Sequence, residues 1–319
     1  FTGVPFFKMI TFFTRRFLQF IPTLLAVTLI VFVLLSVLPG DAAFFRAAGV
    51  KRGEMNEEAV ERLREEWGLN DPIYVRYFNF LKGLVRGDLG DSFRTGESMS
   101  AVLASRLPVT LKLVGFSILL AVVGGLSLGF LAAVYKGTSI DLVSMIIAIT
   151  GISIPEFWSG MMLLLLVGVY WNLLPAGGYD GTLMSLILPA VTLGFRYMAL
   201  IARITRSSML DIMNKDYVRT ARSKGLVERV VRSKHVFRNA LIPILTIVGL
   251  ESGWILANTV IIEKVFSLPG IGQLLVISVY SRDIPAEQAG IMVIVLGFLT
   301  LNLLVDLTYG FLDPRIRYD

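Results

Sequence analysis

Long apolar segments dominate this sequence and constrain its fold more than any other feature. Six of them approach or exceed the ~20 residues that an α-helix needs to cross a bilayer. They are residues 17–38, 109–134, 140–171, 183–202, 240–262 and 289–307. Of the 319 residues, 55% are hydrophobic and 17% are charged, which is unlike a soluble globular protein. The sequence therefore predicts an all-α membrane protein with six transmembrane helices.

The third apolar segment, residues 140–171, is the longest. At 1.5 Å per residue its helix would be about 48 Å long, too long for one perpendicular crossing and too short for two. Pro155 and Glu156 interrupt it. We therefore predict one crossing and a re-entrant or interfacial piece after Pro155.

The distribution of charge predicts the orientation. The segment 203–239 contains ten Lys and Arg residues against three acidic ones, and such loops stay on the cytoplasmic side. With Arg15 and Arg16 inside, six crossings place both termini in the cytoplasm and residues 39–108 outside. Residues 1–8 precede Met9, which reads as a natural start, so we expect them to be a remnant outside the fold. Residues 9–319 are expected to form a single transmembrane domain.

The outer loop, residues 39–108, has helical patterns of its own. Apolar residues at helical spacing in residues 56–67 predict a surface helix that Asn56 caps and Gly68 ends. Residues 74–85 predict a second helix. A structured extracytoplasmic loop is therefore expected between the first two spans.

The cytoplasmic segment 203–239 also contains a helix signal. Asp216 is suited to be an N-cap, Tyr217 to Lys224 are compatible with a helix, and Gly225 is suited to a left-handed C-cap. A short capped helix in a loop indicates a docking element. The alternative is a basic topology signal that only stays solvated.

Several polar residues lie inside the apolar segments. An ionisable group that faces lipid costs several kcal/mol, so it normally faces a partner or an aqueous path. Glu251, Asn258 and Arg196 are the candidates for a substrate path. Asn302 and Asp306 lie near the cytoplasmic end of the last span, where an interhelical hydrogen bond is the simpler interpretation.

Five separated motifs carry a resemblance that covers nearly the whole chain from Met9. They are Leu38-Pro39-Gly40-Asp41, Gly87-Asp88-Leu89-Gly90, Asp216 to Gly225 followed by Arg238 to Pro243, Glu263 to Gly272, and Asp313-Pro314-Arg315-Ile316-Arg317. In this order they resemble the permease subunits of the oligopeptide and dipeptide family of ABC importers. That family of binding-protein-dependent inner-membrane components also includes nickel and glutathione importers.

The resemblance implies a type I importer permease in a bacterial or archaeal cytoplasmic membrane, surrounded by lipid, that helps to form a pore for di- or oligopeptides. It implies four kinds of partner: a second homologous permease, two cytoplasmic ATPase subunits that bind ATP and Mg, and an extracytoplasmic substrate-binding protein. Segment 203–239 would be the coupling loop. Its coupling residues would be Asp216, Tyr217, Arg219, Thr220, Ala221, Lys224 and Gly225.

The sequence differs from the wider class of importer permeases at one motif of the coupling loop. The wider class has Glu-Ala-Ala before the loop glycine, whereas Arg219-Thr220-Ala221 stands here. An ion pair that depends on that glutamate therefore does not carry over.

Catalysis by this chain is not expected. It has no phosphate-binding Gly-x-x-x-x-Gly-Lys loop, no cysteine and one histidine, His235, so we expect no cofactor, metal site or enzyme activity in the chain itself. The net charge of +6 is explained by the cytoplasmic loop and does not indicate nucleic acid. The alternative is a self-sufficient proton-coupled carrier or an intramembrane enzyme that uses Glu251 and Asp306.

Overall fold

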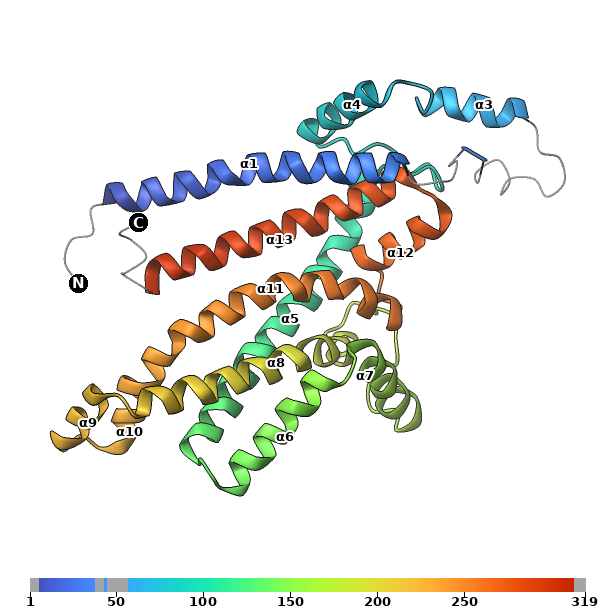
Figure 1. Cartoon of the computed structure of the whole chain (residues 1–319). Coiled ribbons are helices and arrows are strands. Elements are labelled where there is room, and N and C mark those ends of the chain that lie inside the picture. The colour runs from blue at the N-terminus through green and yellow to red at the C-terminus, as the bar shows by residue number, and fades with distance from the viewer. Residues whose placement is uncertain (1–5, 38–42, 45–56, 313–319) are drawn as a thin grey trace. The chain divides into compact units, whose positions relative to one another are not determined.

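The computed structural model describes the backbone of residues 6–37, 43–44 and 57–312, and within these ranges the side chains of residues 18–305 except Ala59. Apart from one isolated β-bridge between Asp91 and Ser98, the regular structure of this part is helical (Figure 1). The α-helices are α1 (Phe6–Val37), α3 (Glu57–Glu66), α4 (Ile73–Arg86), α5 (Met99–Val134), α6 (Ser139–Ser153), α7 (Glu156–Leu163), α8 (Met184–Met213), α9 (Asp216–Ser223), α10 (Glu228–Val230), α11 (Arg238–Val265), α12 (Ile271–Ser281) and α13 (Ile284–Leu312). Two π-helical stretches, η1 (Leu164–Tyr170) and η2 (Val231–Phe237), continue α7 and lead into α11.

Five of the described helical segments are long and apolar enough to cross a membrane. They are Leu18–Val37, Met99–Val134, Met184–Met213, Glu228–Val265 and Ile284–Val305. A sixth span results if the bent pair Ser139–Ser153 and Glu156–Tyr170 counts as one. The prediction of an all-α protein with six transmembrane helices is confirmed.

The break in the third span falls where the sequence predicts it. The two arms meet at 107°, and Pro155 stands just before α7. Ile154 is extended (φ −87°, ψ 129°), because the proline ring disfavours helical backbone in the residue before it. Glu156 therefore begins a new helix in the middle of an apolar segment.

Contacts divide the chain into two compact units. Unit 1 contains residues 1–16, 111–268 and 297–319, and unit 2 contains residues 17–110 and 269–296. Helices α5 and α13 each start in unit 2 and end in unit 1, so neither unit is a continuous piece of chain. A single domain over residues 9–319 stays a prediction.

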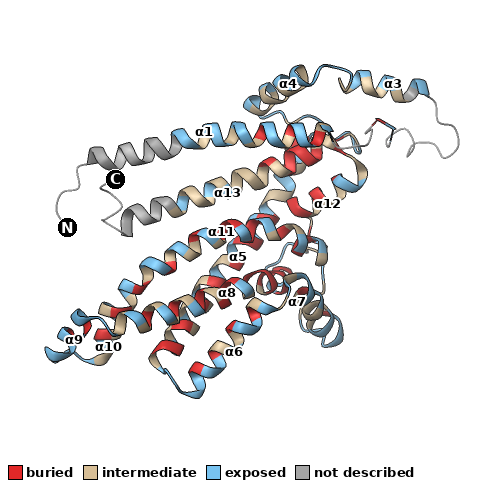
Figure 2. Ribbon diagram, in the orientation of Figure 1, coloured by how far each residue is buried: buried red, intermediate tan, exposed pale blue. Residues whose placement is uncertain are grey.

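Helix α8 is the core helix of unit 1. It contacts α6, α7 and α11, and buried residues follow its length (Figure 2). Small residues allow α5 to approach it closely: a Cβ added to Gly125 would lie 2.7 Å from the side chain of Ile201. The backbone of α8 is therefore held firmly against its neighbours.

Unit 2 packs around a core of Met99, Leu103, Ile271, Leu274, Ala286 and Ala289. These residues come from the first turns of α5, from α12 and from the first turns of α13. Trp67, just after α3, stacks on Phe93 with ring centroids 3.8 Å apart. The outer segment is thus part of the packed structure of unit 2.

The outer segment agrees with the sequence in most respects. Helices α3 and α4 are within one or two residues of their predicted bounds, Gly68 has a positive φ of +62°, and Asn56 lies outside the described residues. The end of the outer loop at residue 108 stays a prediction, although α5 already starts at Met99 and includes Pro108. The 11-residue helix α12 was not predicted, because it is too short to cross a membrane.

Candidate functional site

A cluster of polar side chains lies among the spans of unit 1. Helix α7 contributes Glu156, α8 contributes Arg196 and Tyr197, and α11 contributes Glu251 and Asn258. The Arg196 Nε lies 3.9 Å from the Glu156 Oε1, and the Asn258 amide donates a hydrogen bond of 2.7 Å to the Tyr197 hydroxyl. Glu251 interacts electrostatically with both Arg196 and Glu156. The structure therefore brings together all three substrate-path residues proposed from the sequence.

The carboxylate of Glu156 is the most confined charge in this cluster. Its side chain is 11% exposed, and in the described structure no group donates a hydrogen bond to its buried Oε1. The contact with Arg196 at 3.9 Å is longer than a hydrogen bond. A buried charge that lacks full compensation is costly, so this carboxylate can readily take a better donor.

Arg196 is in the opposite situation, because 53% of its side chain is exposed on the surface of the chain. It lies within the apolar segment of α8, where an arginine that faces lipid is costly. That face of α8 therefore requires an aqueous path or another polypeptide. A small depression lies next to the cluster and is lined by residues that include Ile118, Ala121, Tyr197, Ile201, Glu251 and Ser252.

Two members of the cluster, Glu156 and Tyr197, were not among the predicted site residues. A signal for Glu156 was present, because a charge directly after a helix-breaking proline in a span is typical of the discontinuous helices that form transporter sites. Tyr197 has no comparable signal, since its partner Asn258 is 61 residues away in the chain. The side chain of Asp306 lies outside the described residues.

The cytoplasmic segment contains the predicted helix, α9. Gly225 has the predicted left-handed backbone, with φ +76°. The N-cap prediction is wrong: Lys215 occupies the N-cap position without a side-chain capping hydrogen bond, and Asp216 is the first residue of the helix. The carboxylate of Asp216 lies 3.8 Å from the guanidinium of Arg219. As the first residue of the helix, Asp216 also interacts favourably with the positive end of the helix dipole.

Helix α9 has one buried and one exposed face. Val218 and Ala221 are buried, and α9 contacts η2. The predicted coupling residues other than Ala221 are exposed: Asp216, Tyr217, Arg219, Thr220, Lys224 and Gly225. Tyr217 is an aromatic residue that is 46% exposed. The exposed face of α9 is thus accessible to a partner.

Glu228 braces α9 against the helix that follows. It accepts hydrogen bonds of 3.1 and 3.0 Å from Arg222 and of 3.0 Å from Arg232. The helical run from Glu228 to Val265 has 38 residues, or about 57 Å, so its charged first turns extend beyond a ~30 Å hydrocarbon core. The Arg222 guanidinium, with a smaller contribution from Arg232, lowers the pKa of Glu228. The same run carries Glu251 and Asn258, so α9 is braced to the helix that bears the polar cluster.

A second ion pair connects α6 and α8. Arg206 donates two hydrogen bonds, of 2.6 and 2.8 Å, to the two carboxylate oxygens of Asp141. Asp141 is 6% exposed. This bidentate pair fixes the start of α6 against the cytoplasmic half of α8.

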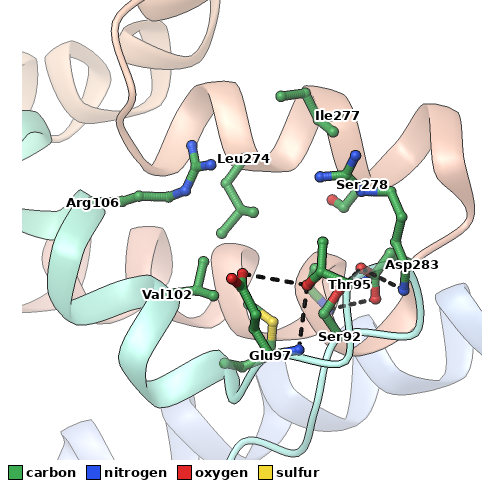
Figure 3. A pocket seen from close by; sticks show the side chains of 12 residues that line it. Ser92, Thr95, Glu97, Val102, Arg106, Leu274, Ile277, Ser278 and Asp283 are labelled. Carbon is green, nitrogen blue, oxygen red and sulfur yellow. Dashed lines mark hydrogen bonds between the residues drawn. The ribbon is translucent and has the colours of Figure 1, made fainter. Parts of the chain in front are cut away.

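Unit 2 contains a separate small cavity (Figure 3). Asp283 lies at its edge, but its carboxylate already accepts hydrogen bonds from the Ser92 hydroxyl and the Phe93 amide. Asp283 therefore holds the loop after α4 in place. None of the site residues proposed from the sequence lines this cavity. Among the described residues, no group of three or more acidic or histidine side chains could hold a metal ion.

Comparison with known families matches both parts of the sequence. The family described as "Binding-protein-dependent transport system inner membrane component" matches residues 125–318, and its N-terminal counterpart matches residues 9–114. The chain is 40% identical over 310 residues to the glutathione transport system permease protein GsiC of Pectobacterium atrosepticum and to that of Escherichia coli K12. Both alignments cover 97% of this chain and 100% of the relative.

Solved structures with the same fold include two ABC transporters. The inward-facing methionine transporter MetNI superimposes with a TM-score of 0.57 at 16% identity, over 67% of this chain and 98% of that chain. An amino acid ABC transporter with histidines gives 0.52 at 19% identity, over 66% and 93% of the two chains. These similarities concern the fold alone. From its length-wide identity and its family matches, the chain belongs to the family of binding-protein-dependent transport system inner membrane components, the multi-pass inner-membrane permeases of ABC transporters.

Proposed function

We propose that this chain is a pore-forming subunit of an ATP-driven, binding-protein-dependent importer of short peptides. The observation that carries the proposal is the physical connection between α9 and the polar cluster. Val218 and Ala221 anchor α9 by burial, and Glu228 bonds it to the helical run that contains Glu251. A force applied to the exposed face of α9 would be transmitted to the intramembrane charges by a stiff element.

The expected partners follow from the surfaces that this chain leaves exposed. Two cytoplasmic ATPase subunits that bind ATP and Mg would hold α9 and its counterpart in the second permease. The second permease would cover the half-exposed Arg196 or share an aqueous path with it. ATP hydrolysis on the partners would then drive alternating access, with cargo delivered by an extracytoplasmic binding protein.

The charges of the cluster support a peptide as the cargo. A short peptide carries an ammonium group and a carboxylate, and the cluster offers Glu156 and Glu251 for the first and Arg196 for the second. The relatives from P. atrosepticum and E. coli are named for glutathione, a tripeptide. We therefore propose di- and oligopeptides, glutathione included, as the substrate class.

The proposal is tested by ATP hydrolysis in vesicles that contain the complete complex. Binding protein loaded with a dipeptide or with glutathione should stimulate hydrolysis more than empty binding protein does. A peptide with both termini blocked, loaded to the same occupancy, should be transported less well. Equal transport of free and blocked peptides would remove the proposed role of the cluster, and absence of stimulation by any loaded binding protein would contradict the proposed function.

The rival function is a self-sufficient proton-coupled carrier or intramembrane enzyme that relies on Glu251 and Asp306. It would act without an ATPase. Vesicles that contain only this chain distinguish the two, because the carrier would accumulate substrate in response to a proton gradient, whereas the importer subunit would not.

A further inference from the structure

Helix α4, in the extracytoplasmic segment, packs against the part of α1 that should lie inside the membrane. The Tyr77 hydroxyl is 3.1 Å from the Thr28 hydroxyl, and its ring and that of Phe80 lie 5.2 and 5.9 Å from the ring of Phe32. Thr28 and Phe32 are 1% and 3% exposed. Both helices belong to unit 2 over these residues.

The depth of this contact follows from the sequence of α1. Arg15 and Arg16 mark the inner boundary, and the apolar span runs from Leu18 to Val37. At 1.5 Å per residue, Phe32 is about 8 Å below the outer end of that span. A helix whose side chains reach Phe32 therefore lies at the level of the outer leaflet of the bilayer, beside its acyl chains.

The outward side of α4 is unusually apolar for an extracytoplasmic loop. Tyr74, Phe78 and Val85 are 71%, 68% and 88% exposed. At 3.6 residues per turn their positions fall within about 40° of one another, next to the face that contacts α1. Lys82 and Arg86 are exposed on the adjacent arc. This division into an aromatic stripe and a basic arc is typical of helices that lie in a membrane interface.

The neighbouring helix α3 provides a contrast within the same segment. It carries five glutamates and two arginines, whereas α4 carries three basic residues and no acidic one. Anionic lipid headgroups attract the second composition and repel the first. The charge difference therefore indicates that the α4 surface contacts lipid, whereas α3 is exposed to water.

We propose that α4 is an interfacial helix embedded in the outer leaflet of the membrane beside α1. Tyr74, Phe78 and Val85 lie among the acyl chains, and Lys82 and Arg86 bind anionic lipid headgroups. The Tyr77 hydrogen bond and the ring contacts with Phe32 hold the helix at this depth. The extracytoplasmic segment is thereby anchored to the bilayer between α3 and α5.

The absence of cysteine from this chain allows a direct test. Single variants Phe78→Cys and Val85→Cys, with Arg62→Cys on α3 as the control, would be spin-labelled in the complete complex, with partner subunits free of reactive cysteine. The complex would be reconstituted in vesicles of phosphatidylethanolamine and phosphatidylglycerol. The ratio of relaxation by oxygen to relaxation by a water-soluble nickel chelate should be severalfold higher at positions 78 and 85 than at position 62.

Two outcomes would overturn the proposal. A ratio at positions 78 and 85 equal to that at position 62 would place α4 in water. Protection from both relaxing agents would show that a second permease or a binding protein covers the stripe.

For the headgroup contact, a larger fraction of phosphatidylglycerol should deepen the label at position 85 in the parent but not in a Lys82→Gln, Arg86→Gln variant. An equal response in both would refute that contact. These outcomes do not depend on the proposed cargo.

Discussion

Replacing Thr220 by proline should uncouple this subunit from its ATPase partners without preventing its insertion into the membrane. Thr220 is the fifth of the eight residues of α9, beyond the first turn, where proline is tolerated. The substitution removes the amide donor of residue 220 and drives the ring against the carbonyl of Asp216, which also accepts the Thr220 hydroxyl at 3.0 Å. In a helix interior this costs ~3 kcal/mol or more, so the equilibrium constant for forming α9 should fall by about two orders of magnitude.

The assay is co-purification of the ATPase with this chain, together with ATP hydrolysis stimulated by loaded binding protein. Thr220→Ala is the matched control, because it also removes the hydroxyl but keeps the amide and has high helix propensity. The alanine variant should retain coupling and the proline variant should lose it, at equal amounts of chain in the membrane. Normal association and normal stimulated hydrolysis in the proline variant would refute the assignment of α9 as the coupling helix.

Three further substitutions or conditions test other parts of the structure. Arg206→Ala leaves the buried Asp141 without its bidentate partner and should destabilise the complex by about 3 kcal/mol, seen as a lower thermal midpoint in detergent; an unchanged midpoint would contradict the pair's structural role. Glu251→Gln should change transport by roughly twofold to fivefold and leave insertion normal, because a partly exposed charge interaction contributes ~0.5–1 kcal/mol. Transport of several peptides at the parental rate would show that Glu251 is not part of the substrate path. Because the pKa of Glu228 is lowered from its ordinary 4.5, its bonds to Arg222 stabilise the fold above that value and are lost as the pH falls through the lower folded pKa. Proteolysis within residues 216–229 should therefore increase at acid pH in the parent and depend less on pH in Arg222→Ala, in which Arg232 alone still bonds Glu228. Equal profiles would refute the brace.

The sequence predicts the spans because an apolar segment of about 20 residues is typical of a transmembrane helix and of few other structures. The break at Pro155 is predicted for the same local reason. Features that depend on tertiary contacts were predicted less well. Helix α12 was missed because its eleven residues are too few to cross a membrane. Helix α5 begins before the predicted apolar span because its first turns are stabilised by packing in unit 2 around Met99.

The polar cluster shows the same division. Glu251 and Asn258 were predicted because a polar group in an apolar span is unusual in itself, and their seven-residue spacing puts both on one face of α11. The contact of Glu156 with Arg196 joins residues of α7 and α8, and only the fold brings them together. The prediction of Asp216 as the N-cap was wrong by one residue, because the sequence is compatible with a helix that starts at either Asp216 or Tyr217.

The most direct test of the proposed importer function is uptake of a labelled dipeptide into vesicles that contain this chain, with and without its ATPase partners. For an importer subunit, uptake should require the ATPase subunits, ATP and the binding protein, and a proton gradient should not replace them. Accumulation of the dipeptide by vesicles that contain this chain alone, driven by a proton gradient, would contradict it.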